Sequence, residues 1–281
     1  ALPIYLRLAR NQLGLGQLYL RHEEPHNARL VFEAAKERLD VLAAEAPESN
    51  SLQRFLAEAY HGLGEVDLSP RLNVASREQA LLLAHTNFDK SRDLREKLVK
   101  STKEEESRGH SRDLARSLGY LGDLYLAQGN VPKAAQAYED SKQLREDLYR
   151  VKTGDPEHRF QYARGLANFG LLERGYRGHL ASASQKVAKA LELQQDLVDD
   201  FPGVAIYLSD LANANNSLAE IDLLLAEEEP LWTVELHDLA HKAATQASEI
   251  FGQQGRAGPG RDRPHLYPRL RRSAEIGRAH V

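Results

Sequence analysis

The stretch that decides the fold is LGYLGDLYLAQGNVPKAAQAYEDSKQLREDL, residues 118–148. Its second half carries small, aromatic and leucine side chains at intervals of three and four residues, the spacing of one helix face. They are Ala134, Tyr138, Ser141 and Leu144. Before them, Gly129 precedes Pro132, an order typical of a helix that ends on glycine and a next helix that opens with proline. The stretch therefore predicts two helices joined by a tight turn.

The Leu-Gly pair at Leu121-Gly122 recurs along the chain in related forms. Its small residue stands at positions 16, 64, 122, 170 and 219, so the spacings are 48, 58, 48 and 49 residues. A nearly fixed period indicates a repeat architecture. Alternating β-branched runs do not occur, which makes a sheet improbable. The sequence thus predicts five helical hairpins, with copies near 6–46, 50–103, 111–153, 158–200 and 206–251.

The motif residues resemble the tetratricopeptide repeat (TPR) family. In the third copy they are Leu121-Gly122, Tyr125, Gly129, Ala134 and Tyr138, and in the first they are Leu15-Gly16, Tyr19, Ala28, Phe32 and Ala35. Other copies depart from the pattern, with Asp67 in place of an aromatic, an insertion near 69–76, and Ala219 for glycine. The periods exceed the family's usual length of about 34 residues, and we expect the excess mostly in a longer second helix and its linker. The resemblance implies an all-α fold, a superhelical α-solenoid of about five stacked hairpins.

Composition excludes several classes of function. The chain has 281 residues, no cysteine and a net charge of -4, which argues against a disulfide framework, a thiolate zinc site and a strongly basic nucleic-acid binder. No run approaches the roughly 18 apolar residues that a membrane span needs. We therefore expect neither nucleic acid nor a membrane as a partner.

Both ends of the chain resemble translated sequencing adapters. The residues concerned are 1–4 and 275–281, and the chain contains no methionine. We expect these ends to be artefacts, residues 5–251 to be the repeat domain, and residues 252–274, rich in Arg, Pro and Gly, to form a disordered tail. The chain is then a fragment whose true start is missing, so the compartment stays open, with the cytoplasm favoured.

No set of residues predicts catalysis. His237 and His241 stand four apart in a helical stretch, the spacing of two metal ligands, but a third ligand and a glutamate base are absent. A solvated helix face is the favoured interpretation of this pair. Residues 255–261 lack the lysine and the hydroxyl residue of a phosphate loop. We expect no enzymatic activity, no cofactor and no bound metal.

The resemblance implies that a ligand binds on the concave surface lined by the first helix of each pair. Its exposed positions lie near each Leu-Gly pair, on the side away from the second helix. They are Arg10, Gln17, Glu58, His61, Glu65, Arg116, Asp123, Arg164, Asn168, Arg174, Asn213, Asn216 and Glu220. Asparagine and arginine suit the backbone and carboxylates of an extended peptide. The family's clamp for a C-terminal carboxylate is missing, because Gly119 and Asp123 occupy positions that it needs.

These features predict a non-catalytic scaffold that binds a protein or peptide. The alternative is that the chain is the C-terminal regulatory or interaction region of a larger bacterial enzyme, such as a serine/threonine protein kinase, because its long repeats look like those of large bacterial proteins. A third hypothesis, a metal hydrolase, depends on His237 and His241 alone. A repeat array without capping repeats exposes an apolar face at its ends, and we expect self-association there.

Overall fold

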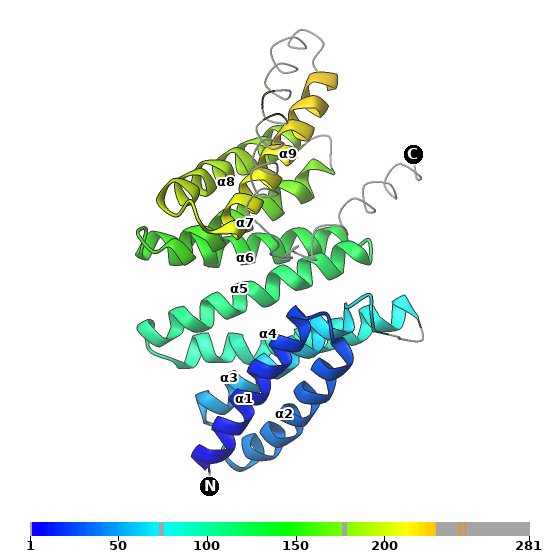
Figure 1. The fold of residues 1–281 in the computed structure, drawn as a ribbon, viewed down its shortest axis with the longest axis vertical. Helices are drawn as coiled ribbons and strands as arrows, with labels where there is room; N and C mark the ends of the chain where they lie inside the picture. Colours follow the sequence, from blue (N-terminus) through cyan, green and yellow to red (C-terminus); the bar gives the residue numbers. More distant parts are fainter. Residues whose placement is uncertain (1, 73–75, 176–178, 229–241, 243–244, 246–281) are drawn as a thin grey trace. The chain divides into compact units, whose positions relative to one another are not determined.

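The structure is a computed structural model that describes residues 2–72, 76–175 and 179–228, together with 242 and 245. In these ranges the secondary structure consists of α-helices, a short 3₁₀ turn and connecting turns (Figure 1). The first helices of the hairpins are α1 (Leu2–Arg21), α3 (Asn50–Asp67), α5 (Glu104–Ala127), α7 (Pro156–Arg174) and α9 (Ala205–Glu228). The second helices are α2 (Pro25–Glu45), α4 (Arg77–Ser101), α6 (Val131–Val151) and α8 (Leu180–Asp200). The all-α prediction is confirmed for these residues.

The turns form where the sequence predicts them. Gly129 has a φ of 74°, the left-handed conformation that glycine adopts without steric cost after a helix. Pro156 opens α7, and the side chain of Asp155 accepts the backbone N–H groups of Glu157 and His158 at 3.0 and 3.4 Å. Such a cap satisfies donors that the first turn of a helix leaves unpaired. Local sequence therefore accounts for these helix ends.

The chain divides into two compact units, Ala1–Leu144 and Arg145–Val281, and the boundary falls inside α6. In the first unit, α1 to α5 pack each on the next in chain order, and α1 also contacts α3. In the second unit, α8 packs on both α7 and α9, while α7 also contacts α9. Successive first helices therefore lie next to each other within a unit, as stacked hairpins require.

Glycine and aromatic residues set the close approach of the helices. The buried ring of Phe32 lies between Gly16 of α1 and Gly62 of α3, and a Cβ on these glycines would come within 2.6 and 2.4 Å of ring atoms. Phe88 meets Gly64, and Tyr138 meets Gly122, in the same way. The small-residue pattern of the sequence is thus a packing requirement, since the ring occupies the space of the missing side chain.

The helices of each repeat are long. The described first helices have 18 to 24 residues and the second helices 21 to 25. The expectation that the excess lies mostly in the second helix and its linker stays a prediction. Residues 229–241, which include His237 and His241, and the predicted tail and C-terminal adapter at 252–281 lie outside the described residues.

Candidate binding surface

Polar side chains of three successive first helices join into a continuous row in the first unit. Gln17 of α1 donates to Glu65 Oε2 of α3 at 3.0 Å, and the Tyr120 hydroxyl of α5 donates to Glu65 Oε1 at 2.6 Å. One turn earlier, Arg116 Nη2 donates to Glu58 Oε2 at 2.5 Å. We call these five residues the first-helix row. Glu58, Glu65 and Arg116 in it are partly exposed, so the row reaches solvent.

A buried polar cluster lies beneath this row, formed by His61, Ser91, Arg95 and Ser117. Arg95 of α4 is 2% exposed and donates to Glu58 Oε2 at 2.8 Å, to the Ser117 hydroxyl at 2.5 Å and to the backbone oxygen of Asp113 at 2.8 Å. Burial, followed by the charge of Arg116, lowers the pKa of the Arg95 guanidinium to about 10, although Glu58 opposes the shift. Because a charge of this kind is costly to bury, its partners matter for stability.

His61 was expected on the exposed surface, and this expectation was wrong. Its side chain is 0% exposed and meets the rings of Phe88 and Tyr120 edge-on, with centroids 5.1 and 5.0 Å away. Helix α3 packs against both α2 and α4, and α4 packs against α5. His61 is therefore enclosed by residues from α4 and α5 that the helix periodicity of α3 alone does not reveal.

Electrostatics hold His61 in its neutral form. Burial first, then Arg116 and Arg95, keep the pKa of the imidazole well below its ordinary value of 6.5. Nδ1 lies 3.3 Å from Arg95 Nη1, which can only donate, so the hydrogen-bond network assigns the imidazole proton to Nε2. Nε2 lies 3.9 Å from Glu65 Oε1 and has no hydrogen-bond partner among the described residues.

We expect the stability of the first unit to fall as the pH drops below 6.5. The unfolded chain then protonates His61 while the native state does not, so the free energy of unfolding decreases by about 1.4 kcal/mol per pH unit. Urea unfolding between about pH 7.5 and pH 5 measures this slope. His61→Phe should flatten it, and His26→Gln, at an exposed position on α2, should leave it unchanged. Equal slopes for the wild type and His61→Phe would contradict the assignment.

In the second unit, two ion pairs connect the first helices α7 and α9. Arg164 Nε lies 3.3 Å from Asp210 Oδ2, and Arg174 pairs with Glu220. Asp210 is buried, which raises the pKa of its carboxyl group, while the charge of Arg164 lowers it. On the same two helices Asn168 and Asn213 are half-buried, and Asn216 is exposed.

The two remaining predicted residues of the first unit lie outside the first-helix row. Arg10 of α1 is exposed. Asp123 of α5 is half-buried and accepts a hydrogen bond from Tyr138 of α6, so it serves the pairing of the two helices of its own hairpin. The structure thus joins Gln17 to Glu65 and Arg116 to Glu58 through direct hydrogen bonds, and leaves Arg10 and Asp123 aside.

Sequence reasoning missed Tyr120, Arg95, Ser91 and Ser117 as members of the site. A signal for two of them is present, because SRDLREKL at 91–98 returns as SKQLREDL at 141–148. Ser91 and Ser141 both donate to a backbone oxygen of the preceding helix, at 2.9 and 2.7 Å. Arg95 and Arg145 are both buried. A serine followed four residues later by arginine therefore marks a buried polar position in this chain.

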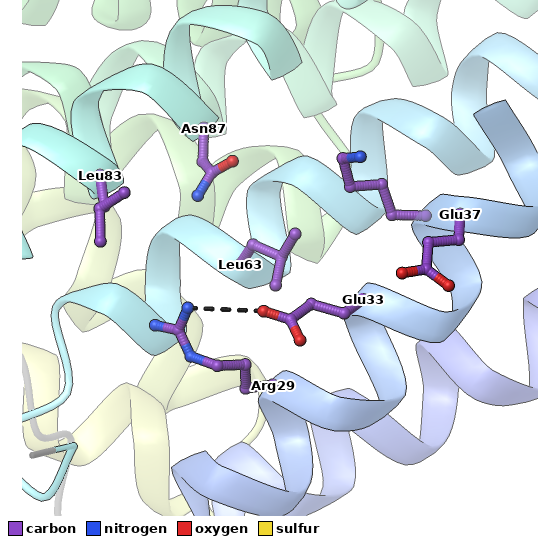
Figure 2. Close-up of a pocket in the computed structure, with 7 residues that line it drawn as sticks. Arg29, Glu33, Glu37, Leu63, Leu83 and Asn87 are labelled. Atoms are coloured by element: carbon purple, nitrogen blue, oxygen red, sulfur yellow. Dashed lines mark ion pairs between the residues drawn. The ribbon is translucent and has the colours of Figure 1, made fainter.

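A separate pocket of about 260 Å³ opens between the second helices α2 and α4, with Leu63 of α3 between them (Figure 2). Both of its lining cations are paired: Arg29 with Glu33 at 3.6 Å and with Asp67, and Lys36 with Asp40 at 2.7 Å. Asp67, which stands where the repeat usually has an aromatic, is buried, and burial raises the pKa of its carboxyl group. The ion pairs of Arg29 and Lys36 hold the walls of the pocket together, so these two cations are engaged within the protein.

Metal sites and membrane spans are both absent from the described part of the chain. Within it, no three His, Asp or Glu side chains lie close enough together to hold a metal ion. None of its helices combines the length and the apolar character that crossing a membrane demands. The expectation that the chain binds no metal stays a prediction, since His237 and His241 lie outside the described residues.

Comparisons with known proteins complete the description. No family model matches the chain, and no curated protein matches it. Among solved structures, it is similar to the MamA RS-1 ArsTM double mutant, with 17% identity and a TM-score of 0.41 over 89% of this chain and 96% of that one. It is also similar to a tetratricopeptide repeat protein from Parabacteroides merdae ATCC 43184, with 13% identity and a TM-score of 0.26 over 97% and 99% of the chains. A third similar structure is the DHF58 filament, with 13% identity and a TM-score of 0.18 over 98% of this chain and 96% of that one.

The packing inside each unit carries the classification. Helical hairpins follow one another in chain order, successive first helices touch, and in the first unit the aromatic ring of a second helix fills the space beside a glycine of the first helix. The described helices therefore have a TPR-like fold, with the hairpin stacking of an all-α solenoid within each unit.

Proposed function

We propose that this chain is a non-catalytic interaction scaffold that binds an extended segment of a partner protein on the first-helix face of its first unit. The supporting observation is the first-helix row, which brings polar side chains of α1, α3 and α5 together through mutual hydrogen bonds. Side chains held in this way lose less conformational entropy when a ligand binds. Their partial exposure leaves them accessible to a partner.

Glu65 is the proposed anchor for a basic side chain of the ligand. Its carboxylate accepts hydrogen bonds from two uncharged donors, Gln17 and Tyr120, and the nearby His61 is neutral. Within the described residues no lysine or arginine forms an ion pair with Glu65. Glu58, by contrast, is shared by the guanidinium groups of Arg95 and Arg116. Arg95 and Arg116 act on Glu65 only at longer range, without a direct ion pair, so we expect Glu65 to favour a partner segment that carries lysine or arginine.

Fluorescence anisotropy with labelled Gly/Ser peptides that carry no, two or four lysines tests this proposal. We expect affinity to rise with the number of lysines and to fall with salt, since partly exposed charges are screened. Glu65→Gln removes the charge and keeps one oxygen, which can accept from either Gln17 or Tyr120 but not from both in the present geometry. It should weaken binding of the four-lysine peptide roughly five- to tenfold.

Glu37→Gln is the matched control, because Glu37 is an exposed glutamate of α2 that lines the separate pocket. It should leave peptide affinity unchanged. Affinity that does not depend on lysine, or an equal loss for both variants, would reject the first-helix row as the binding site. The regulatory region of a larger enzyme stays an alternative prediction, because it concerns residues outside this chain.

We extend the proposal to the first helices of the second unit. Asn168, Asn213 and Asn216 have amide groups that can both donate to and accept from a peptide backbone. Arg164, Arg174 and Glu220 are engaged in the ion pairs described above, so they act mainly in joining α7 to α9.

A further inference from the structure

One side of α1 is apolar and exposed. Leu8, Leu15 and Leu18 on this side are between 40% and 47% exposed, and they follow each other at helical spacing. Gly14 lies among them, and a Cβ built on it would have no atom within 4 Å. We call these four residues the outer face of α1. It is distinct from the first-helix row, to which α1 contributes Gln17.

The equivalent positions of the next repeats are covered. A shift of one period leads from the three leucines to Leu56, Leu63 and Val66 of α3, and a further shift leads to Leu114, Leu121 and Leu124 of α5. All six are 8% exposed or less. The α3 residues share a core cluster with Ala28, Phe32, Ala35 and Leu39 of α2, and Leu121 and Leu124 share one with Ala84 and Phe88 of α4. The cover is in each case the second helix of the preceding hairpin.

The position of Gly14 indicates that the helix covering this face carries an aromatic residue. Its equivalent in α3 is Gly62, whose missing side chain is replaced by the ring of Phe32. Its equivalent in α5 is Tyr120, which stacks on the ring of Phe88 with centroids 5.0 Å apart. An aromatic side chain of a second helix therefore lies on this position in both covered repeats, while the space beside Gly14 is open.

We propose that the outer face of α1 is a docking surface for the second helix of a further helical hairpin. The helix that fits presents an aromatic residue with small residues four positions before it and three after it, as Ala28, Phe32 and Ala35 do on α2. Its ring enters the space beside Gly14, and its small residues allow the backbones to approach. This partner would bind on a different side of α1 from the peptide proposed above, so neither proposal depends on the other.

A chain extended by its own first repeat tests the inference. The extended chain carries a second copy of residues 1–48 directly before Ala1. The linker between the added second helix and Leu2 then has the same length as the linker between α2 and Asn50. We expect the added helix to cover the outer face and to slow hydrogen exchange of the α1 amides at least tenfold. In the original chain Gly14→Leu should raise the thermal midpoint, because leucine favours a helix more than glycine does. In the extended chain it should lower the midpoint, because the leucine occupies the space of the ring.

The glycine at 109 in α5 provides the control, because a Cβ there also meets nothing within 4 Å. Gly109→Leu should shift the midpoint equally in both chains. The proposal is overturned if Gly14→Leu shifts the thermal midpoint in the same direction in both chains. It is also overturned if hydrogen exchange of the α1 amides is equally fast in both chains. Light scattering tests whether a second copy of the chain binds to the outer face instead. If the original chain is a dimer that Gly14→Leu dissociates, the outer face binds a second copy and the proposal is overturned.

Discussion

Phe32→Ala is expected to destabilise the first unit by about 3–5 kcal/mol, the cost of removing a large aromatic side chain from a core. The ring is fully buried and touches the backbone of two first helices, at Gly16 and Gly62. Its loss opens a cavity that joins two repeats, and helices of this length cannot close it without giving up other contacts. Urea unfolding at constant pH measures the loss. Leu30→Ala on the same helix is the control, because Leu30 is 66% exposed and should change stability by less than about 0.5 kcal/mol.

The Phe32 ring also predicts opposite effects for alanine substitutions at two glycines. Gly62→Ala should destabilise by roughly 1–3 kcal/mol, because the new methyl group meets Phe32 and the ring cannot retreat from Gly16 on its other side. Gly14→Ala, at the equivalent position of α1, should instead stabilise by roughly 0.5–1 kcal/mol, since it gains helix propensity without a clash. A stabilising Gly62→Ala, or a Phe32→Ala no worse than Leu30→Ala, would show that the ring does not hold the two repeats together.

Glu58→Ala is expected to cost about 2–4 kcal/mol, because it leaves the guanidinium of Arg95 buried without its carboxylate. We expect a smaller loss of stability than for a fully buried ion pair, because Glu58 is itself partly exposed. Arg95 keeps the Ser117 hydroxyl, a backbone oxygen and His61 Nδ1 as acceptors, all of them uncharged, and the positive charge of Arg116 lies nearby. Equilibrium unfolding of the variant measures the effect.

A double variant separates the charge effect from simple loss of packing. Glu58→Ala combined with Arg95→Met removes both charges, and methionine fills much of the space of the arginine. We expect it to recover most of the stability that Glu58→Ala loses, so the two substitutions should be strongly non-additive. Glu33→Ala, which breaks the more exposed pair with Arg29, should cost less than about 1 kcal/mol. Additive losses in the double variant would argue against a buried ion pair.

Much of the fold could be predicted because its signals are local. Helix hydrogen bonds close within one segment, so the three-and-four spacing of small and aromatic residues was enough to place α2, α4, α6 and α8. Turn chemistry at Gly129 and Pro156 placed two of the ends. The close fit of ring and glycine followed from the same pattern, since the two residue types recur together in the first three repeats.

The candidate site could be predicted only in part. The spacing of Ala84, Phe88 and Ser91 continues to Leu94, yet Leu94 is half-buried and its neighbour Arg95 is almost fully buried. Positions 94 and 95 lie three and four residues after Ser91, so helical spacing alone accepts either. The choice depends on how α4 is rotated against α3 and α5. That rotation is a property of the assembled unit.

The amino-acid sequence by itself determined that this chain forms helical hairpins, because helices and turns are stabilised by residues close together in the chain. Only the tertiary structure decided that His61 is enclosed, that Arg95 and Glu58 form a pair, and that Glu65 accepts hydrogen bonds from Gln17 and Tyr120. These properties arise where residues up to 58 positions apart meet, and the free energy of a buried polar group depends on those partners.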